Sequence, residues 1–168
     1  LSMIEFDGVN DRFTLPDGTI PAGNSNYTVI VIATFSEPGN DWYSVIESGS
    51  MGAYSSDTNA IAINKQANSG ANNNFIANYW WGNDVWTSDD SIEFEQVSLT
   101  SFRYDGSTRD SFINGGLDVS DSATNRNSTT GLNVIGSNRG DSYALDAKVA
   151  EILVFDESLS ETELAYVN

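Results

Sequence analysis

The stretch Gln96–Ser120 constrains the fold more than any other part of this sequence, because it reads as two β-strands joined by a tight turn. Residues 97–104 are rich in β-branched and aromatic side chains, which favour strands. Asp105-Gly106-Ser107 can supply the left-handed backbone that a chain reversal needs. A second strand is predicted to return over Arg109–Asn114 and to end at Gly115-Gly116. The rest of the chain is therefore expected to lie as strands on either side of this hairpin.

The first strand of the hairpin does not keep one alternation of apolar residues. Val97 and Leu99 occupy odd positions, whereas Phe102 and Tyr104 occupy even ones. One extra residue near Thr100-Ser101 would bring all four side chains to one face. We therefore predict a β-bulge there, which would bend the strand within a curved sheet.

Short runs of strand-forming residues recur along the chain, with turn residues between them and no spacing typical of strand–helix–strand units. The run Tyr27–Phe35 is apolar at odd and even positions alike, which is typical of a central strand covered on both faces. Asp121–Thr130 is poor in apolar residues and is predicted to be exposed. The other strands are predicted at Met3–Phe6, Arg12–Leu15, Tyr43–Ser48, Ala60–Lys65, Phe75–Trp81, Leu132–Gly136 and Ala147–Phe155, with a brief edge strand at Ile92–Phe94.

The end of the chain has the signature of a helix start. Ser160 and Glu163 have the spacing of a capping box, in which each side chain bonds the main-chain N–H of the other residue. Leu159 and Leu164 occupy the hydrophobic-staple positions around it. One short helix is therefore predicted after the last strand. With many short strands and little helix, residues 1–168 are expected to form a single all-β domain, a two-sheet antiparallel sandwich.

Histidine and cysteine are both absent from the 168 residues. Their absence removes the commonest general base, the Ser–His and Cys–His nucleophile pairs, and almost all zinc, copper and iron sites. Oxygen ligands remain, and these favour calcium if the chain binds a metal at all. Disulfides are excluded too, although a sandwich of this size does not need them.

The chain is strongly acidic, with twenty-four acidic residues against seven basic ones and a formal charge of −17. Such a surface repels phosphate groups, so nucleic acid and anionic membranes are poor partners. No stretch is long and apolar enough to cross a bilayer. The start at Leu1-Ser2-Met3 runs straight into a predicted strand and suggests a segment of a longer polypeptide.

Three segments resemble a known family: FDGVND at Phe6–Asp11, RYDGSTRDSFINGG at Arg103–Gly116, and LNVIGSNRGDSYALDAKVAEILVFDESLSETEL at Leu132–Leu164. Their order and spacing resemble the laminin-G-like branch of the concanavalin A-like lectin/glucanase superfamily. The resemblance implies a β-jelly-roll of two packed antiparallel sheets, one often concave, in modules that are commonly extracellular and bind glycans or proteins. One departure is Leu145-Asp146-Ala147, which stands where a glycine usually precedes the last long strand.

Glucanases of this superfamily carry catalytic carboxylates on one strand in a pattern that resembles E-x-D-x-x-E, and this sequence does not match it. Glu93-Phe94-Glu95 has the alternate spacing that places two carboxylates on one face, but the third carboxylate is missing. Glu151 has Leu153 where its partner would stand. The sequence therefore predicts that the domain is not an enzyme.

The best functional hint is a cluster of aromatic residues beside amides and carboxylates. Residues 79–86 contain one tyrosine and three tryptophans, with Asn83 and Asp84 between them. Sugar rings stack on indoles, and their hydroxyls need amide or carboxylate partners. Because adjacent strand residues point to opposite faces, at least one of the neighbouring indoles is expected in the core. The predicted ligand-binding residues are Trp42, Trp81, Asn83, Asp84 and Trp86.

A second candidate site is a cluster of oxygen ligands. Asp7, Asn10 and Asp11 converge in one turn after the first strand, and Asp156 follows the last strand. In the family that the chain resembles, the terminal strands lie near one another, so these oxygens could meet around one structural calcium ion. The competing interpretation is that Asp-Gly and Asn-Asp are ordinary turn residues.

Two functions follow from these observations. The first is a non-catalytic module of a larger extracellular or surface protein that binds a glycan or polysaccharide. The second is a structural or display domain of a virion, an adhesin or another surface assembly, whose partners would be neighbouring protein subunits. Open indoles beside Asn and Asp side chains would favour the first function, whereas buried indoles would favour the second.

Overall fold

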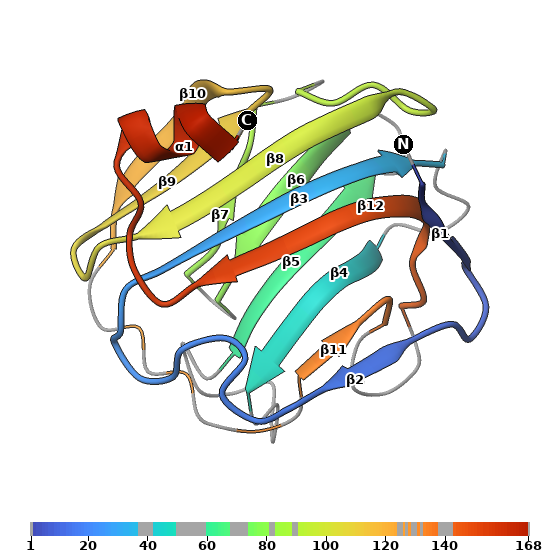
Figure 1. The fold of residues 1–168 in the computed structure, drawn as a ribbon, viewed down its shortest axis with the longest axis horizontal. Coiled ribbons are helices and arrows are strands. Elements are labelled where there is room, and N and C mark those ends of the chain that lie inside the picture. Colours follow the sequence, from blue (N-terminus) through green and yellow to red (C-terminus); the bar gives the residue numbers. More distant parts are fainter. Residues whose placement is uncertain are drawn as a thin grey trace.

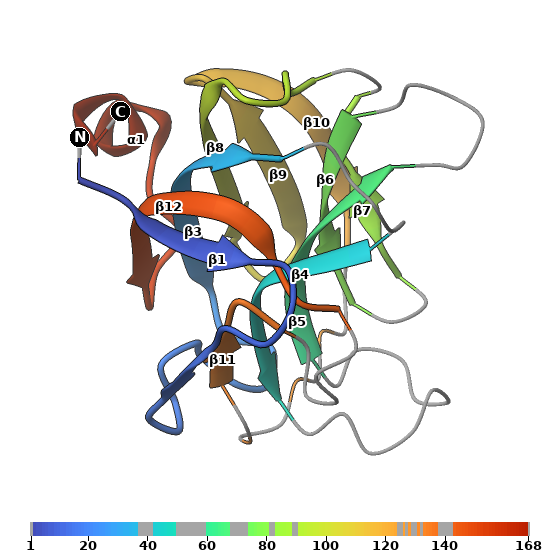
Figure 2. The same cartoon turned by 90° about the vertical axis from the view of Figure 1, so that its right-hand side faces the viewer.

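The computed structural model describes residues 2–36, 42–49, 60–67, 74–80, 83–88, 91–123, 126, 128, 131, 133–137 and 143–167, and for residues 42, 60–67 and 74 it describes the main chain alone. Within this part of the chain, two antiparallel sheets stack face to face, and the C-terminal helix packs outside one of them (Figure 1, Figure 2). This confirms the predicted all-β, two-sheet antiparallel jelly-roll sandwich with one short C-terminal helix.

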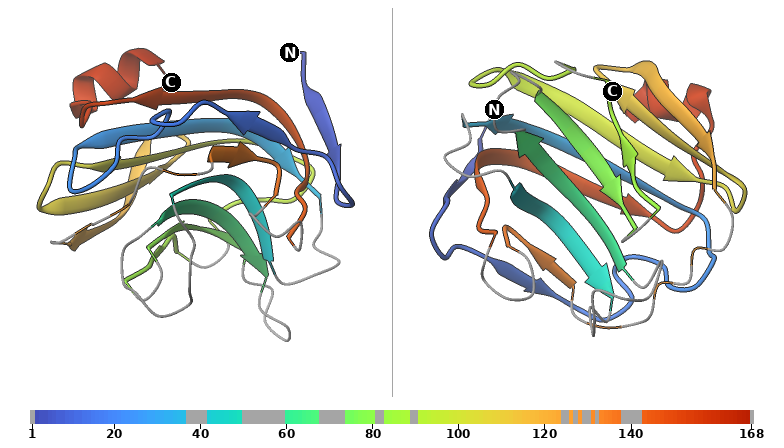
Figure 3. Two further views of the ribbon diagram at one scale, coloured as in Figure 1. Left: turned by 90° about the horizontal axis from the view of Figure 1, so that it is seen from below. Right: turned by 180° about the vertical axis from the view of Figure 1, so that it is seen from behind.

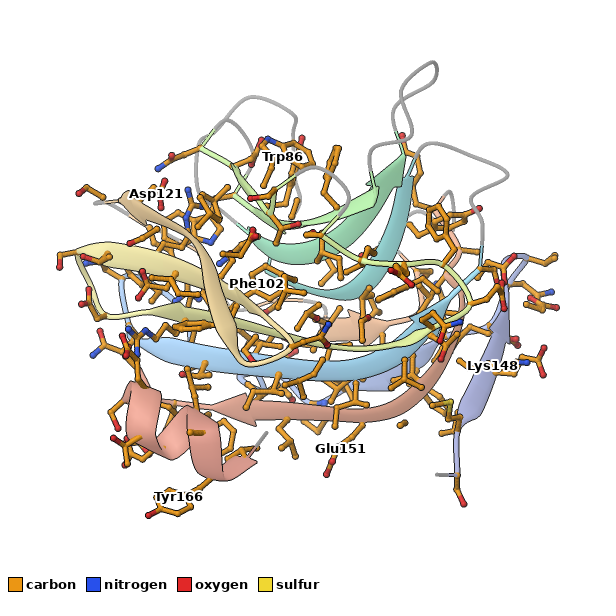
Figure 4. All side chains as sticks on the ribbon, turned by 90° about the horizontal axis from the view of Figure 1, so that it is seen from above. Trp86, Phe102, Asp121, Lys148, Glu151 and Tyr166 are labelled. Carbon is orange, nitrogen blue, oxygen red and sulfur yellow. The ribbon has the colours of Figure 1, made fainter. Side chains whose placement is uncertain are left out.

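The two sheets differ in what covers their outer faces. Helix α1 (Glu161–Val167) lies outside the first sheet, which we call the helix-covered sheet, whereas the second curves so that its outer face is hollow, and we call it the concave sheet (Figure 3, Figure 4). The helix-covered sheet has the order β1 (Ile4–Asp7), β12 (Asp146–Phe155), β3 (Tyr27–Phe35), β8 (Val97–Tyr104), β9 (Thr108–Ile113), β10 (Gly116–Ser122). The concave sheet has the order β2 (Phe13–Leu15), β11 (Asn133–Ile135), β4 (Trp42–Gly49), β5 (Ala60–Ala67), β6 (Asn74–Tyr79), β7 (Val85–Trp86).

Strand β3 is the central strand that its composition predicts. It pairs with β12 on one side and β8 on the other. Val29 and Val31 point into the main core between the sheets, whereas Ile30 packs with Leu159 and Leu164 under α1. Fully burying a side chain of this kind contributes about 1.5–3 kcal/mol. Both faces of β3 are therefore covered.

Strand β8 contains no bulge, so the predicted bend near Thr100-Ser101 is wrong. It pairs with β3 from Val97 to Tyr104 without a register shift. Phe102 faces the main core, and Leu99 faces the cluster under α1. Because the helix covers the outer face of this sheet, apolar residues suit both faces of the strand. Register shifts occur instead in β4, β10 and β12.

The turn between β8 and β9 has the predicted chemistry. Gly106 adopts a φ of +95°, and the Asp105 N–H donates to the Thr108 carbonyl at 3.1 Å. The Asp105 carboxylate accepts hydrogen bonds from the N–H groups of Thr108 at 2.7 Å and Ser107 at 2.8 Å. The bond from Thr108, helped by those from Ser107, lowers the pKa of Asp105 below its ordinary value because it favours the charged form.

We expect Asp105→Asn to reduce the loss of stability in acid. The depressed folded-state pKa means that this carboxylate stabilises the fold above its unfolded-state pKa of about 3.9 and that the contribution is lost as the pH falls through the lower, folded value. Asparagine keeps an acceptor oxygen but does not titrate. Urea denaturation at neutral pH and in steps below about pH 4 tests this, with the exposed Asp17→Asn as control. Parallel acid profiles for Asp105→Asn and the parent would contradict the prediction.

The predicted capping box begins α1. The Ser160 N–H donates to Glu163 Oε2 at 2.8 Å, and the Glu163 N–H donates to Ser160 Oγ at 3.2 Å. Leu159 and Leu164 are buried against Phe112. The helix is thereby fixed on the outer face of the sheet. Among the described residues, no helix is long and apolar enough to span a membrane.

Three local predictions are wrong. Ile92–Phe94 forms turns rather than an edge strand, although Ile92 belongs to the core. Asn114 and Gly115 have φ values of 49° and 83° and form a tight turn that leads into β10, a strand that was not predicted. The segment 121–130 is not uniformly exposed, because Arg126 and Ser128 are buried.

Candidate functional site

The outer face of the concave sheet carries three aromatic rings in contact. Trp86 on β7 meets Phe75 and Tyr79 on β6 edge-on, with ring centroids 5.1 Å and 6.1 Å apart. Phe75 is buried, whereas Tyr79 and Trp86 are partly exposed. Figure 4 shows Trp86 on the open side of the curved sheet and Phe102 between the sheets. We call Phe75, Tyr79 and Trp86 the aromatic platform.

Strand alternation places the neighbouring residues of β6 in the core. Trp80 is fully buried, lies 4.9 Å from Tyr104 in a T-shaped contact, and donates its indole N–H to the Tyr27 hydroxyl at 3.3 Å. Asn78 donates to the same hydroxyl at 2.7 Å. The expectation that one of the adjacent indoles is core is thus confirmed for Trp80, and Tyr79 is left on the outer face.

Three of the predicted ligand-binding residues come together beside the platform. Asn83, Asp84 and Trp86 all belong to residues 83–88, which we call the platform loop, and all three side chains are partly exposed. Within this loop, Val85 and Trp86 form the short strand β7.

The other two predicted residues are described in part or not at all. The main chain of Trp42 pairs with Gln66 on β5, which pairs in turn with Phe75, so the Trp42 position stands in the same row of the concave sheet as the platform. Its side chain lies outside the description. Trp81 lies outside the described residues.

The Asp84 side chain is partly exposed and also accepts a hydrogen bond from the main chain. Its Oδ1 accepts the Trp80 N–H at 2.8 Å and so ties the platform loop to the residue that follows β6. Burial, and then the charge of Asp84, raise the pKa of Tyr79 above its ordinary value. The Tyr79 hydroxyl therefore remains a neutral donor and acceptor at neutral pH.

Arg109 on β9 anchors the platform loop from inside the sandwich. Its guanidinium is fully buried and lies over the Trp80 ring, 4.1 Å from the centroid. It donates to both carboxylate oxygens of Asp121, its register partner on β10, at 3.1 Å and 2.8 Å. It also donates to the Asn83 carbonyl at 2.7 Å. A bidentate pair of this kind fixes the position of the guanidinium, and with it the start of the loop.

The other end of the platform loop is held by the same strand. The Ser88 N–H donates to Asp118 Oδ2 on β10 at 2.6 Å. Both ends of the loop therefore depend on β10 carboxylates, one directly and one through Arg109. Because β10 was not predicted from the sequence, this support was not predicted either.

A second buried arginine lies elsewhere in the core. Arg126 stacks on the Tyr27 ring at 4.6 Å and donates to the carbonyls of Pro21 and Ser25 and to the Ser128 hydroxyl. Burial lowers the pKa of Arg126 to about 10, so it remains charged at neutral pH. These bonds fasten residues 126 and 128 to the loop before β3.

The residues predicted to bind calcium do not all come together. Asp7, Asn10 and Asp11 share the turn after β1, where Asp11 Oδ2 accepts the Asp7 N–H at 3.1 Å. Asp7 pairs with Asp146 at the start of β12, whereas Asp156 follows the far end of that strand. Placing Asp156 with the other three was therefore wrong. The described residues contain no group of three or more acidic side chains suited to a metal. Calcium binding by this turn stays a prediction.

Solved structures with the same fold come from several sources. A carbohydrate-binding domain (CBM40) of the Ruminococcus gnavus IT-sialidase, bound to α2,3-sialyllactose, has a TM-score of 0.72 at 13% identity, covering 99% of this chain and 96% of the other. Domain 4 of AbnA, an extracellular arabinanase from Geobacillus stearothermophilus, in complex with arabinotriose, has a TM-score of 0.67 at 15% identity, covering 99% and 81%. A SAP-like pentraxin from Limulus polyphemus has a TM-score of 0.71 at 15% identity, covering 98% and 80%.

Comparison with curated proteins gave no match. A laminin-G-type sequence model of the concanavalin A-like lectin/glucanases superfamily matches residues 7–165, which is nearly the whole chain. The matched range includes the second and third segments on which the resemblance rested and all of the first except Phe6. The chain therefore belongs to the concanavalin A-like lectin/glucanases superfamily.

Proposed function

We propose that the chain is a non-catalytic glycan-binding module of a larger extracellular or surface protein, with the aromatic platform as its sugar contact. The observation that carries this proposal is that Tyr79 and Trp86 present partly exposed rings on the hollow outer face of the concave sheet, beside Asn83 and Asp84. The similar domains solved with sialyllactose and arabinotriose support a glycan as the ligand class.

The geometry suits a sugar for two physical reasons. The partly exposed Trp86 ring supplies apolar surface on which a sugar ring can stack, and the partly exposed Asn83, three residues before it, supplies an amide that can bond a sugar hydroxyl. Asn83 and Trp86 lie in the platform loop, which is fixed at both ends by β10 carboxylates, so little conformational entropy is lost when a ligand binds.

Trp86→Ala is expected to weaken glycan binding about tenfold or more, because removing a central aromatic contact typically costs at least about 1.4–2 kcal/mol. Trp86→Phe keeps a ring on Phe75 and should retain part of the affinity. A glycan array followed by isothermal titration calorimetry on the best ligand provides the measurement.

The matched control is Tyr166→Ala. Tyr166 is an aromatic residue on α1 that is 86% exposed on the opposite side of the molecule (Figure 4). The Tyr166→Ala substitution should leave the glycan affinity unchanged. Equal affinities for the parent and Trp86→Ala would remove the platform from the proposal, and a parent protein that binds no glycan would remove the proposed function.

The alternative is a structural or display domain that packs against neighbouring protein subunits. Large apolar side chains are exposed along the β1–β2 edge: Ile4 is 55%, Val9 66% and Phe13 48% exposed. Exposed apolar groups of this size are typical of contact surfaces. Concentration-dependent sedimentation without any glycan binding would favour this second function.

A further inference from the structure

We infer that the aromatic platform selects uncharged glycans and rejects those that carry carboxylates, such as sialic and uronic acids. This inference rests on the proposed function and names the class of ligand for the same site. The ligand class inferred here differs from the ligand of the Ruminococcus gnavus domain, which is sialylated.

Apart from the buried Arg109, which is paired with Asp121, the described charges in and beside the platform loop are negative. Asp84 lies two residues before Trp86 in the platform loop, and the Asp118 carboxylate binds the N–H of Ser88, two residues after it. Glu47 on β4 stands in the Tyr79 row of the concave sheet, because both residues pair with Ala62. Its side chain is only 3% exposed and accepts a hydrogen bond from the Ser44 hydroxyl, so it is not among the charges that face a ligand.

Three of the five described basic side chains already bind groups of the protein. Arg109 and Arg126 are 0% and 1% exposed and bonded to protein groups, so neither is offered to a ligand on the outer face. Arg103 donates to Asp110 at 2.7 Å and to the Leu159 carbonyl at 2.9 Å, on the outer face of the helix-covered sheet.

The two remaining described basic residues lie far from the platform. Lys148 is on β12, which pairs with the edge strand β1 at the opposite end of the helix-covered sheet from β10 (Figure 4). Arg12 directly precedes β2, and β2 and β7 are the two opposite edges of the concave sheet. The side chains of Lys65 and Arg139 lie outside the description, and the main chain of Lys65 stands in the row of Tyr43 and Ile76, which belong to the core.

A ligand carboxylate normally requires a charge-assisted donor such as arginine. Here the described charges supply repulsion instead, about two- to threefold in affinity for each carboxylate at about 8 Å in a water-like dielectric. Two such charges, Asp84 and Asp118, together with the net charge of −17, predict a preference of about fivefold for an uncharged ligand over its acidic counterpart.

The test uses pairs of glycans that differ only in charge. Calorimetric titration at low salt compares methyl-esterified with free oligogalacturonides, and lactose with sialyllactose, with arabinotriose as a further uncharged probe. The uncharged member should bind about fivefold more tightly, and added salt should reduce the difference. Tighter binding of the acidic member would overturn this inference while leaving the proposed function intact. Binding of neither class would overturn both.

Charge variants test the assigned cause. Asp84→Asn combined with Asp118→Asn keeps an acceptor oxygen at both positions and removes two charges, so the preference should fall about fivefold. Glu151→Gln is the matched control, since Glu151 is exposed on the opposite side of the molecule (Figure 4). A preference that persists unchanged in the double variant would overturn the assignment of selectivity to these carboxylates.

Discussion

Arg109→Met is expected to lower the free energy of unfolding by about 3–5 kcal/mol, the range measured when one partner of a buried ion pair is removed. Methionine fills much of the space over Trp80 but donates no hydrogen bonds. Asp121 then loses both of its bonds to the guanidinium, and the carbonyl of Asn83 loses its donor. Thermal or urea denaturation measures the loss, and a variant as stable as the parent would contradict the prediction.

Two further variants separate the ion pair from general damage. Asp121→Asn alone leaves the buried guanidinium without its carboxylate, and combining it with Arg109→Met should cost less than the sum of the single changes. Lys148→Met removes an exposed cation and should stay within about 0.5 kcal/mol of the parent. Additive losses in the double variant would mean that the two side chains act independently.

Arg109→Met is also expected to weaken ligand binding, although Arg109 does not itself contact the ligand. Arg109 holds the Asn83 carbonyl, so its loss frees one end of the platform loop. At a temperature where Arg109→Met remains folded, glycan affinity should fall while the platform residues are unchanged. This outcome would identify Arg109 as a positioning residue.

Local signals in the sequence were sufficient for much of the fold. The Asp105-Gly106 turn and the Ser160–Glu163 capping box depend only on neighbours in the chain, and both form as predicted. The bulge in β8 was wrong because the apolar outer face is explained by α1, which lies far away in sequence. Local alternation alone could not reveal that the helix covers this face.

In the candidate site too, the residues that cluster in the sequence could be predicted, whereas those brought together by strand pairing could not. Trp86, Asn83 and Asp84 could be predicted because they cluster within a few residues. The buried support could not, because Arg109 and Asp121 become partners only through the register of β9 and β10. The Asn114-Gly115 turn was the available signal for β10, since Asn-Gly is typical of two-residue hairpins, but it was interpreted as the end of a strand.

Gly136→Ala is expected to be the most damaging small substitution, with a loss of about 3–5 kcal/mol and a fall in Tm of roughly 8–15 °C. Gly136 follows β11 at a φ of +92°, and a methyl group there would overlap the Phe6 ring, 2.5 Å from Cδ1 and closer still to Cε1, and would lie 2.8 Å from the Asp11 carbonyl oxygen. Phe6 is only 2% exposed, so its ring has little room to move. The cost therefore combines backbone strain with overpacking.

Gly18→Ala is the matched control for the backbone term. Gly18 has a similar φ of +79°, but no atom lies within 4 Å of the added methyl group, so only the strain of about 1–2 kcal/mol should appear. The difference between the two variants measures the contact between Gly136 and Phe6, in which the first and last segments of the family resemblance meet directly. Equal losses would show that this contact tolerates a methyl group, and that the glycine is required only for its backbone conformation.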